Sequence, residues 1–566
     1  MNRWGWVFIC IFGSVLSLLC GWLMPAHLRA LDVAVVERAG RRTETLLDRG
    51  ERYANDGKLG PAQLVSQAAS QEGLWGREKL ALSVSNVAAA HPNWQSWGGG
   101  AAPLEVLFSD SGRPTGEAEP LTEWAIRQDN RAKALQLLGT SAEPAVRHLM
   151  RCRGLTNTMI FAPSQSSSGQ AFDAAVSITG LLIEENKLSG DLSNVVTRAA
   201  MEANAGNPQA IEPMLLEMMA LGQRMNWAQL VEFVGSMRDQ QTLRRLADYV
   251  RQNEKELPVL FSAVVLSHDA GGIAEYLVNF SESGMKDIRG ALRFGTGGLN
   301  ELLKRNQRLY ISSLQRRLAE YPGFAGVIDL ASEYCWLTPW IALTIKWLLY
   351  LLSGFLLAMA MHFARPAVQA MERPLQVGGF HVAREFLFAL GFLVAILLLT
   401  EPFLAQQGQR TEFMFRVRLP GISSTPAAGT GSGQQTKRIL MEKSLVPLGL
   451  FFVLQGLLYV GCLVKLAEIR RQRVPAKIKL RLLDNEDHLF DAGLYLGFVG
   501  TIISLILFSL NIVTPSLMAA YSSTSFGIIF VSIFKIFNLR PARRRILLEA
   551  EANETANAPV RQFTPA

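Results

Sequence analysis

The residues best suited to chemistry are the small and hydroxyl-bearing residues of two apolar stretches near the C-terminus. The first stretch holds Gly497, Gly500 and Thr501, and the second holds Ser523, Thr524 and Gly527. In a bilayer, small residues let helices approach closely and hydroxyl groups place polar atoms inside a bundle, so this pattern could line an ion path. Ordinary helix packing is the alternative, because serine and threonine can bond to their own helix at little cost.

Signatures of other chemistry are weak in this sequence. The seven histidines show no HExxH pattern and no ligand spacing to a carboxylate or cysteine. His268 lies beside Asp269, but adjacent residues in a turn usually point apart. Gly295 to Gly298 lacks the Lys-Ser/Thr of a phosphate-binding loop and is expected to open a helix over 299–308. Lys346 and Glu401 lie near the ends of apolar segments. We therefore expect no metal, no cofactor and no enzymatic activity.

Composition predicts a membrane protein with a large water-soluble part. Of the 566 residues, 49% are hydrophobic, and the mean hydropathy is +0.17. Residues 30–335 read as water-soluble, whereas residues 337–536 are dominated by long uncharged runs, with the boundary near Trp336. The net charge of +8 comes largely from two short C-terminal segments, which argues against a nucleic-acid groove and for a topology signal.

Six segments are apolar enough for the roughly 20 residues that a membrane crossing needs. They are approximately 4–23, 337–361, 386–404, 445–466, 490–510 and 516–534. The stretch from Ala492 to Phe534 has no charged residue and is about twice as long as one crossing, so it predicts a hairpin with a turn at Asn511 to Pro515.

Basic residues near short loops predict the orientation. Residues 465–481 and 535–545 carry dense Lys/Arg clusters and belong in the cytoplasm. Alternation then places residues 405–444 outside, although that loop also carries six basic residues at lower density, and residues 25–336 outside as well. The expected location is a bacterial inner membrane, crossed several times, with residues 31–335 in the periplasm. The first span could be a cleaved signal peptide or a retained anchor.

The periplasmic part is predicted to be all-α. Apolar residues recur at helical spacing in 212–221, 227–237 and 243–250, with short turns between them. Stacked antiparallel pairs in a solenoid are expected, with an irregular helical bundle as the alternative. Two segments, 90–115 and 162–170, read as loops because they are rich in glycine or serine.

The final hairpin resembles the proton-channel core of the TolQ, ExbB and MotA family. In that family a span with the pattern Leu-Gly-x-x-Gly-Thr is followed by an alanine-rich span with a small-Thr-small-x-Gly pattern, and then by a basic cytoplasmic helix. The matching segments of this chain are Leu496 to Thr501, Ser523 to Gly527 and Arg540 to Arg545. The resemblance implies that Thr501 and Thr524, with Ser523, face a pore, and that Gly497, Gly500 and Gly527 pack helices. It covers about residues 445–550.

This chain departs from the family pattern at several points. Ser504 stands where the family usually has glycine, and Ala519 stands where the TolQ and ExbB branch has an intramembrane glutamate. The loop between the two spans, 511–515, is shorter than the family's. Neither span carries an ionisable side chain, so the resemblance implies a single-span partner of the TolR or ExbD kind that supplies a membrane aspartate.

Together these patterns predict a channel-type subunit of an inner-membrane, proton-driven energy-transducing complex. The chain would form a homo-oligomeric ring around the partner helix, and its periplasmic domain would bind another protein. The alternative is a non-channel membrane scaffold whose periplasmic domain binds protein partners. The predicted domains are an anchor or signal peptide (1–30), a periplasmic helical domain (31–335), two spans (336–405), an outside loop (406–444), the channel-like core (445–548) and a disordered tail (549–566).

Overall fold

The chain is almost wholly helical and divides into two compact units. The computed structural model describes residues 3–99, 107, 119–311, 321–364, 380–403, 433–472, 474–509 and 517–556. One unit, the helical unit, is Leu31–Arg316, and the other, the membrane unit, combines Met1–Ala30 with Arg317–Ala566. The strands of the described part, β1 (Ala30–Asp32) and β2 (Arg308–Tyr310), pair in one small sheet. The predicted helical architecture is confirmed.

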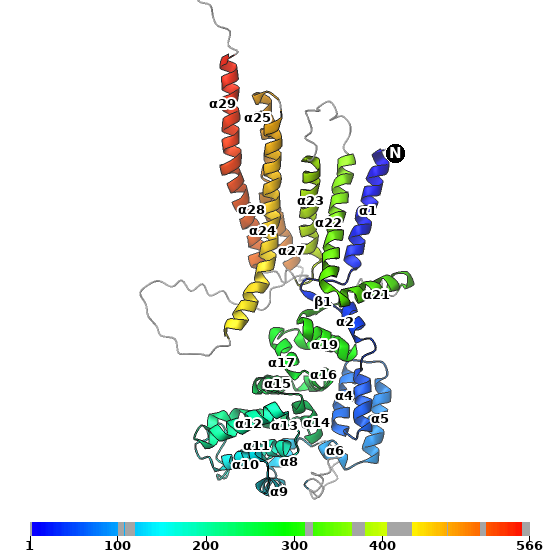
Figure 1. The fold of residues 1–566 in the computed structure, drawn as a ribbon, viewed down its shortest axis with the longest axis vertical. Coiled ribbons are helices and arrows are strands. Elements are labelled where there is room, and N and C mark those ends of the chain that lie inside the picture. Colours follow the sequence, from blue (N-terminus) through cyan, green and yellow to red (C-terminus); the bar gives the residue numbers. More distant parts are fainter. Residues whose placement is uncertain are drawn as a thin grey trace, which may run out of the picture. The chain divides into compact units, whose positions relative to one another are not determined.

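The helical unit is built from short helices joined by tight turns (Figure 1). The predicted helices at 212–221, 227–237 and 243–250 are confirmed as α13, α14 and α15. The helices are α2 (Val33–Gly40), α3 (Leu46–Asn55), α4 (Leu59–Gln71), α5 (Arg77–Ala90), α6 (Trp94–Trp97), α8 (Leu121–Ile126), α9 (Gln128–Gly139), α10 (Pro144–Arg151), α11 (Gln170–Glu184), α12 (Gly190–Asn204), α13 (Glu212–Gly222), α14 (Trp227–Gly235), α15 (Gln240–Gln252), α16 (Leu257–Ser267), α17 (Ala270–Asn279), α18 (Gly284–Leu292) and α19 (Gly295–Arg305).

Stacking in the helical unit is regular only through its middle. Helices α9, α11, α13, α15 and α17 contact one another in that order, and α10 packs on α12. Near the N-terminus, α4 packs on α16 and α2 packs on α19, so the first helices close against the last ones. Helix α16 is apolar and buried along its whole length, which makes it the centre of the core.

The glycine-rich piece before α19 is part of that helix. The sequence predicts a helix over 299–308, whereas α19 begins at Gly295 and ends at Arg305. Gly295 has φ +75°, and a Cβ there would lie 2.5 Å from the carbonyl oxygen of Glu44. A Cβ on Gly297 would lie 2.2 Å from the carbonyl oxygen of Ala39. These glycines are therefore needed for the close contact between α19 and the segment around the end of α2.

The serine-rich segment 162–170 is a loop up to the start of α11 at Gln170, as predicted. A buried glutamate anchors the chain just before it. The carboxylate of Glu212 accepts hydrogen bonds from the backbone N–H groups of Met159, Ile160 and Phe161 at 3.0–3.1 Å. Burying a carboxylate is costly unless it is hydrogen-bonded, so these donors explain how Glu212 is tolerated. Of the other predicted loop, 90–115, most lies outside the described residues.

The membrane unit contains helices long and apolar enough to cross a bilayer. Four candidate spans are Trp4–Leu23, Pro339–Ala364, Phe452–Arg471 and Thr524–Ala552. They indicate a membrane protein and overlap four of the six predicted spans, although Thr524–Ala552 shares only residues 524–534 with the predicted span 516–534. The other two, 386–404 and 490–510, coincide with helices whose side chains are only partly described. The helices are α1 (Arg3–Leu23), α21 (Pro322–Leu337), α22 (Pro339–Ala364), α23 (Phe380–Thr400), α24 (Gly433–Arg471), α25 (Ala476–Asn485), α26 (Asp487–Phe490), α27 (Ala492–Ser509), α28 (Leu517–Phe534), the π-helix η5 (Lys535–Leu539) and α29 (Arg540–Ala556).

Three boundaries of the membrane unit differ from the predicted domains. The composition of the chain changes only near Trp336, but the membrane unit already begins at Arg317. The reason is that α21 packs beside α22. Helix α24 begins at Gly433, so residues 433–444 of the predicted outside loop are helical, and residues 404–432 lie outside the described part. Helix α29 continues to Ala556 into the predicted disordered tail, where alanine and glutamate favour helix.

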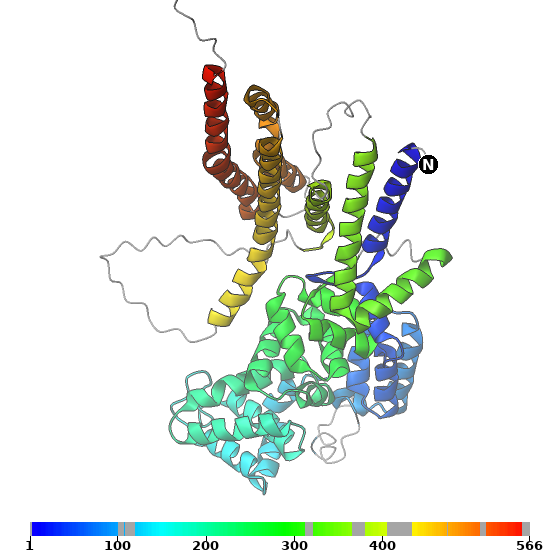
Figure 2. The ribbon, with the colours of Figure 1, turned by 45° about the horizontal axis from the view of Figure 1, so that its top comes forward.

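The helices of the membrane unit contact one another in the order α1, α22, α23, α24, α28, and α27 also packs against α28 (Figures 1 and 2). Specific contacts fix the first pair. Each hydroxyl of Ser14 and Ser353 lies 2.9 Å from the other residue's carbonyl oxygen. A Cβ on Gly21 would lie 2.7 Å from the Tyr350 ring, so the glycine permits close helix approach.

Candidate functional site

The two predicted pore-lining threonines meet across the contact between α27 and α28. The hydroxyl oxygens of Thr501 and Thr524 lie 2.5 Å apart. Each hydroxyl also lies within hydrogen-bond distance of the carbonyl oxygen of Gly497, at 2.9 Å from Thr501 and 3.1 Å from Thr524. Ser523 lies in α28, but its side chain is outside the described residues. The contact therefore gathers two hydroxyls and a carbonyl inside the apolar part of the chain.

Glycines bring the same two helices together. A Cβ on Gly527 would lie 2.6 Å from the carbonyl oxygen of Gly493. This oxygen also accepts a hydrogen bond from Nε2 of Gln455, at 3.1 Å. Gly497 is buried, and the surroundings of Gly500 are outside the described part. The predicted packing role thus has a concrete contact at Gly527, whose partner glycine the motif did not single out.

Gln455 is a polar residue that the sequence interpretation overlooked. Its side chain is 1% exposed on α24, and it donates to α27 as described above. The signal that could have identified it is its position in the middle of the uncharged run 445–464. An amide in the membrane interior is stabilised only by hydrogen bonds, so Gln455 ties α24 to the hairpin.

The ionisable residues near the span ends form a second site. Nζ of Lys346 lies 3.6 Å from Oε1 of Glu401, and Nδ1 of His27 lies 3.7 Å from Oε2 of Glu401. Lys346 also donates to the carbonyl oxygen of Ala26 at 2.6 Å, and the N–H of Leu28 donates to Glu401 at 2.9 Å. The three side chains, here called the ion cluster, are nearly inaccessible, at 1% for Lys346 and Glu401 and 4% for His27.

The ion cluster joins three parts of the membrane unit. Lys346 comes from α22, Glu401 follows α23, and His27 follows α1. Buried charges are stable only when they are paired and hydrogen-bonded, and both conditions hold here. Sequence inspection placed Lys346 and Glu401 separately near span ends and did not predict that they meet. The cluster therefore fastens the end of α1 to the two following spans.

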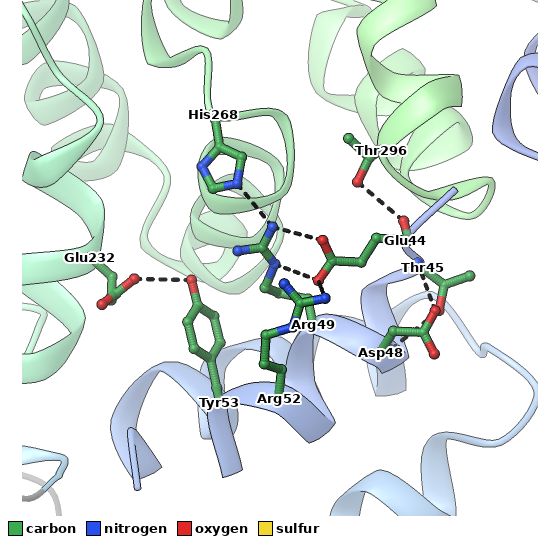
Figure 3. Close-up of polar contacts among 9 residues, drawn as sticks. All are labelled: Glu44, Thr45, Asp48, Arg49, Arg52, Tyr53, Glu232, His268 and Thr296. Atoms are coloured by element: carbon green, nitrogen blue, oxygen red, sulfur yellow. Dashed lines mark hydrogen bonds and ion pairs between the residues drawn. The ribbon is translucent and has the colours of Figure 1, made fainter. Parts of the chain in front are cut away.

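A polar cluster in the helical unit has a structural role (Figure 3). The guanidinium of Arg49 forms an ion pair with Glu44 at 2.8 Å, and its Nη2 lies 2.9 Å from Nε2 of His268. Asp269, in contrast, accepts from the N–H of Gly272 at 2.8 Å and so caps α17. His268 and Asp269 therefore have separate partners, as expected for adjacent residues in a turn.

The same cluster connects α3 to two further elements. The hydroxyl of Tyr53 donates to Glu232 of α14 at 3.1 Å, and the carbonyl oxygen of Glu44 accepts from the hydroxyl of Thr296 at 3.2 Å (Figure 3). The backbone N–H of Thr296 donates to the same oxygen at 2.8 Å. Burial, reinforced by the charge of Glu232, raises the pKa of Tyr53, so its phenol remains a donor. Because every drawn group has a partner within the protein, we interpret this cluster as a link between N-terminal and C-terminal helices.

Among the described residues, no group of three His, Cys, Asp or Glu side chains could hold a metal ion. No protein-family model matches this chain, and neither a curated protein nor a solved structure matches it. Functional inference therefore depends on the residues of the membrane unit themselves.

Proposed function

We propose that this protein is a channel-type subunit of a proton-driven energy-transducing complex in a bacterial inner membrane, similar to TolQ, ExbB and MotA. The observation that carries the proposal is the pairing of Thr501 and Thr524 beside the carbonyl oxygen of Gly497. The helical unit would lie in the periplasm and bind a protein partner there.

The position of the threonines supports this role. Thr501 lies near the middle of α27, and Thr524 near the middle of α28. Hydroxyl and carbonyl oxygens at the membrane midplane can bind water or a carboxylate and lower the cost of a charge there. Because α27 and α28 carry no Asp, Glu, Lys, Arg or His, the titrating aspartate would come from a single-span partner. The chain would surround that partner as a homo-oligomer.

The helical extension of α28 also supports the proposal. The chain continues from α28 through η5 into α29, which carries Arg540 and Arg543 to Arg545. In the family that this hairpin resembles, a basic helix extends the second span into the cytoplasm. The positive-inside rule gives the same orientation here.

A membrane scaffold is the second candidate. One observation favours it: the hydroxyls of Thr501 and Thr524 are satisfied by each other and by Gly497 within a single chain. Such hydroxyls can serve helix packing alone. The spans would then anchor the helical unit, whose stacked helices offer surfaces for protein partners.

Proton flux through the reconstituted complex distinguishes the two candidates. The protein is purified with its bound partners from native membranes and placed in liposomes. We expect the double variant Thr501→Val/Thr524→Val to lose at least about tenfold of the flux, since valine removes the polar atoms at nearly constant volume. Thr344→Val is the matched control, because Thr344 is exposed on α22 and, within the described part of the chain, its hydroxyl donates to its own helix, to the carbonyl oxygen of Trp340 at 2.8 Å. Wild-type flux from the double variant would favour the scaffold.

A further inference from the structure

A cavity lies at the basic end of the membrane unit, between α24 and the helical extension of α28. Its volume is about 330 Å³, at the lower end of the size range of ligand pockets. One part of its wall is apolar, with Leu463, Leu466 and Phe537. The other part is polar and positively charged, with Arg470, Asn538 and Arg545. We call this site the basic cavity.

The two arginines of the basic cavity are available for an external anion. In the described part of the chain, neither Arg470 nor Arg545 forms an ion pair. The neighbouring carboxylates pair with other cations, namely Asp484 with Arg543 at 2.6 Å, Asp491 with Lys535 at 2.8 Å and Glu486 with Lys465 at 3.3 Å. Two guanidinium groups beside one cavity, without acids to neutralise them, favour binding of a phosphate.

The wall of the cavity is held in place by the fold. Phe537 and Asn538 belong to η5, and π-helices are rare and frequently mark functional sites. Nδ2 of Asn538 donates to the hydroxyl of Tyr459 on α24 at 2.9 Å, which fixes η5 against that helix. Phe537 is nevertheless 71% exposed, so a large aromatic face remains uncovered next to the arginines.

We propose that the basic cavity binds the phosphodiester headgroup of an anionic phospholipid. Arg470 and Arg545 would contact the phosphate, and the acyl chains would run along Leu463 and Phe537. The cavity lies where apolar spans give way to Lys/Arg-rich ends, which the positive-inside rule assigns to the cytoplasmic leaflet, and anionic headgroups gather at that surface. A soluble anion without an apolar part would make no contact with the exposed aromatic face of Phe537. This inference does not require that the protein conducts ions.

Titration of the delipidated full-length complex with single lipids, followed by native mass spectrometry, tests the proposal. The probes are phosphatidylglycerol, phosphatidylcholine and glycerol phosphate. We expect phosphatidylglycerol to bind more tightly than phosphatidylcholine. Each arginine near an anionic lipid contributes roughly fivefold in affinity, so Arg470→Gln/Arg545→Gln should weaken phosphatidylglycerol binding by about 25-fold. Both arginines are exposed, so the variant should fold.

The matched control is Arg540→Gln/Arg544→Gln, which removes the same charge from exposed positions of α29 that do not line the cavity. This control should retain nearly all of the preference for phosphatidylglycerol. Equal losses in the two double variants would overturn the proposal, since they would indicate diffuse attraction to the basic end. Equal binding of the two lipids would overturn it as well. Efficient competition by glycerol phosphate would show that a soluble phosphate compound, not a lipid, is the ligand.

Discussion

Replacing Lys346 by methionine should destabilise the membrane unit strongly. The substitution keeps the volume but leaves Glu401, 1% exposed, without the ammonium group that lies 3.6 Å away. Removing one member of a buried ion pair typically costs about 3–5 kcal/mol, because the remaining charge stays desolvated. The N–H of Leu28 and the nearby His27 would compensate only in part. We expect a cost of about 3 kcal/mol for Lys346→Met.

The double variant Lys346→Met/Glu401→Gln should be less destabilised than the sum of the single variants. Glutamine retains an acceptor for the N–H of Leu28 and no longer buries an unpaired charge. Directly interacting residues give coupling energies of about 1–3 kcal/mol in such cycles. Lys465→Met is the control, because the pair of Lys465 with Glu486 at 3.3 Å is one-third exposed and should contribute under about 1 kcal/mol.

Reaction of Cys10 with a maleimide during heating in mild detergent measures this effect. Cys10 lies on α1 and is 7% exposed, so its modification, identified by peptide mass spectrometry, reports separation of α1. A cost of 3 kcal/mol should lower the midpoint by on the order of 10 °C. Additive effects of the two substitutions, or a Lys346→Met variant as stable as the Lys465→Met control, would refute the ion cluster as a fastening.

Three further predictions concern other parts of the chain. Burial raises the pKa of Glu217 from 4.5 to about 7, and the charge of Arg244 opposes this shift only in part. The folded protein therefore binds this proton more tightly than the unfolded protein, and its stability falls as the pH rises from 4.5 through 7. Glu217→Gln should therefore raise stability at pH 8 by about 2 kcal/mol and hardly change it at pH 5. The measurement is the urea concentration at the midpoint of alkylation of buried Cys152, and an equal change at both pH values would contradict the prediction. Glu212→Gln should cost about 2–4 kcal/mol and remove hydrogen-exchange protection from the amides of 159–161, because three N–H groups lose a charged acceptor; unchanged exchange would argue against the anchor. The contacts of Ser14 and Gly21 with α22 predict that the first span is retained, so the intact mass of the mature protein should include α1, and a mass that begins near residue 30 would contradict this.

Local patterns allowed accurate prediction of individual elements. Helical periodicity located α13 to α15, and the length of an uncharged stretch predicted α27 and α28 as separate helices. The proximity of Thr501 and Thr524 agrees with the grouping made from the motif, although their role in a pore remains a proposal. These successes share one property: the information lies within a few dozen consecutive residues.

Contacts between distant residues could not be predicted in the same way. Leu28 and Glu401, which are hydrogen-bonded, are 373 positions apart, and no local pattern relates them. The sequence predicted the start of α19 at 299 and not at Gly295, because the partners of Gly295 and Gly297, Glu44 and Ala39, lie at the other end of the helical unit. The two compact units divide at Arg316, whereas the composition of the chain changes only near Trp336, because α21 resembles a soluble helix in composition but packs with α22.

The most direct test of the channel proposal is the composition of the complex in native membranes. The protein would be extracted in mild detergent and examined by native mass spectrometry, with identification of every bound protein. The proposal predicts a closed ring of several copies that holds a small single-span protein with an aspartate in its membrane segment. A monomer or dimer that carries only soluble periplasmic proteins would contradict the channel and leave the scaffold.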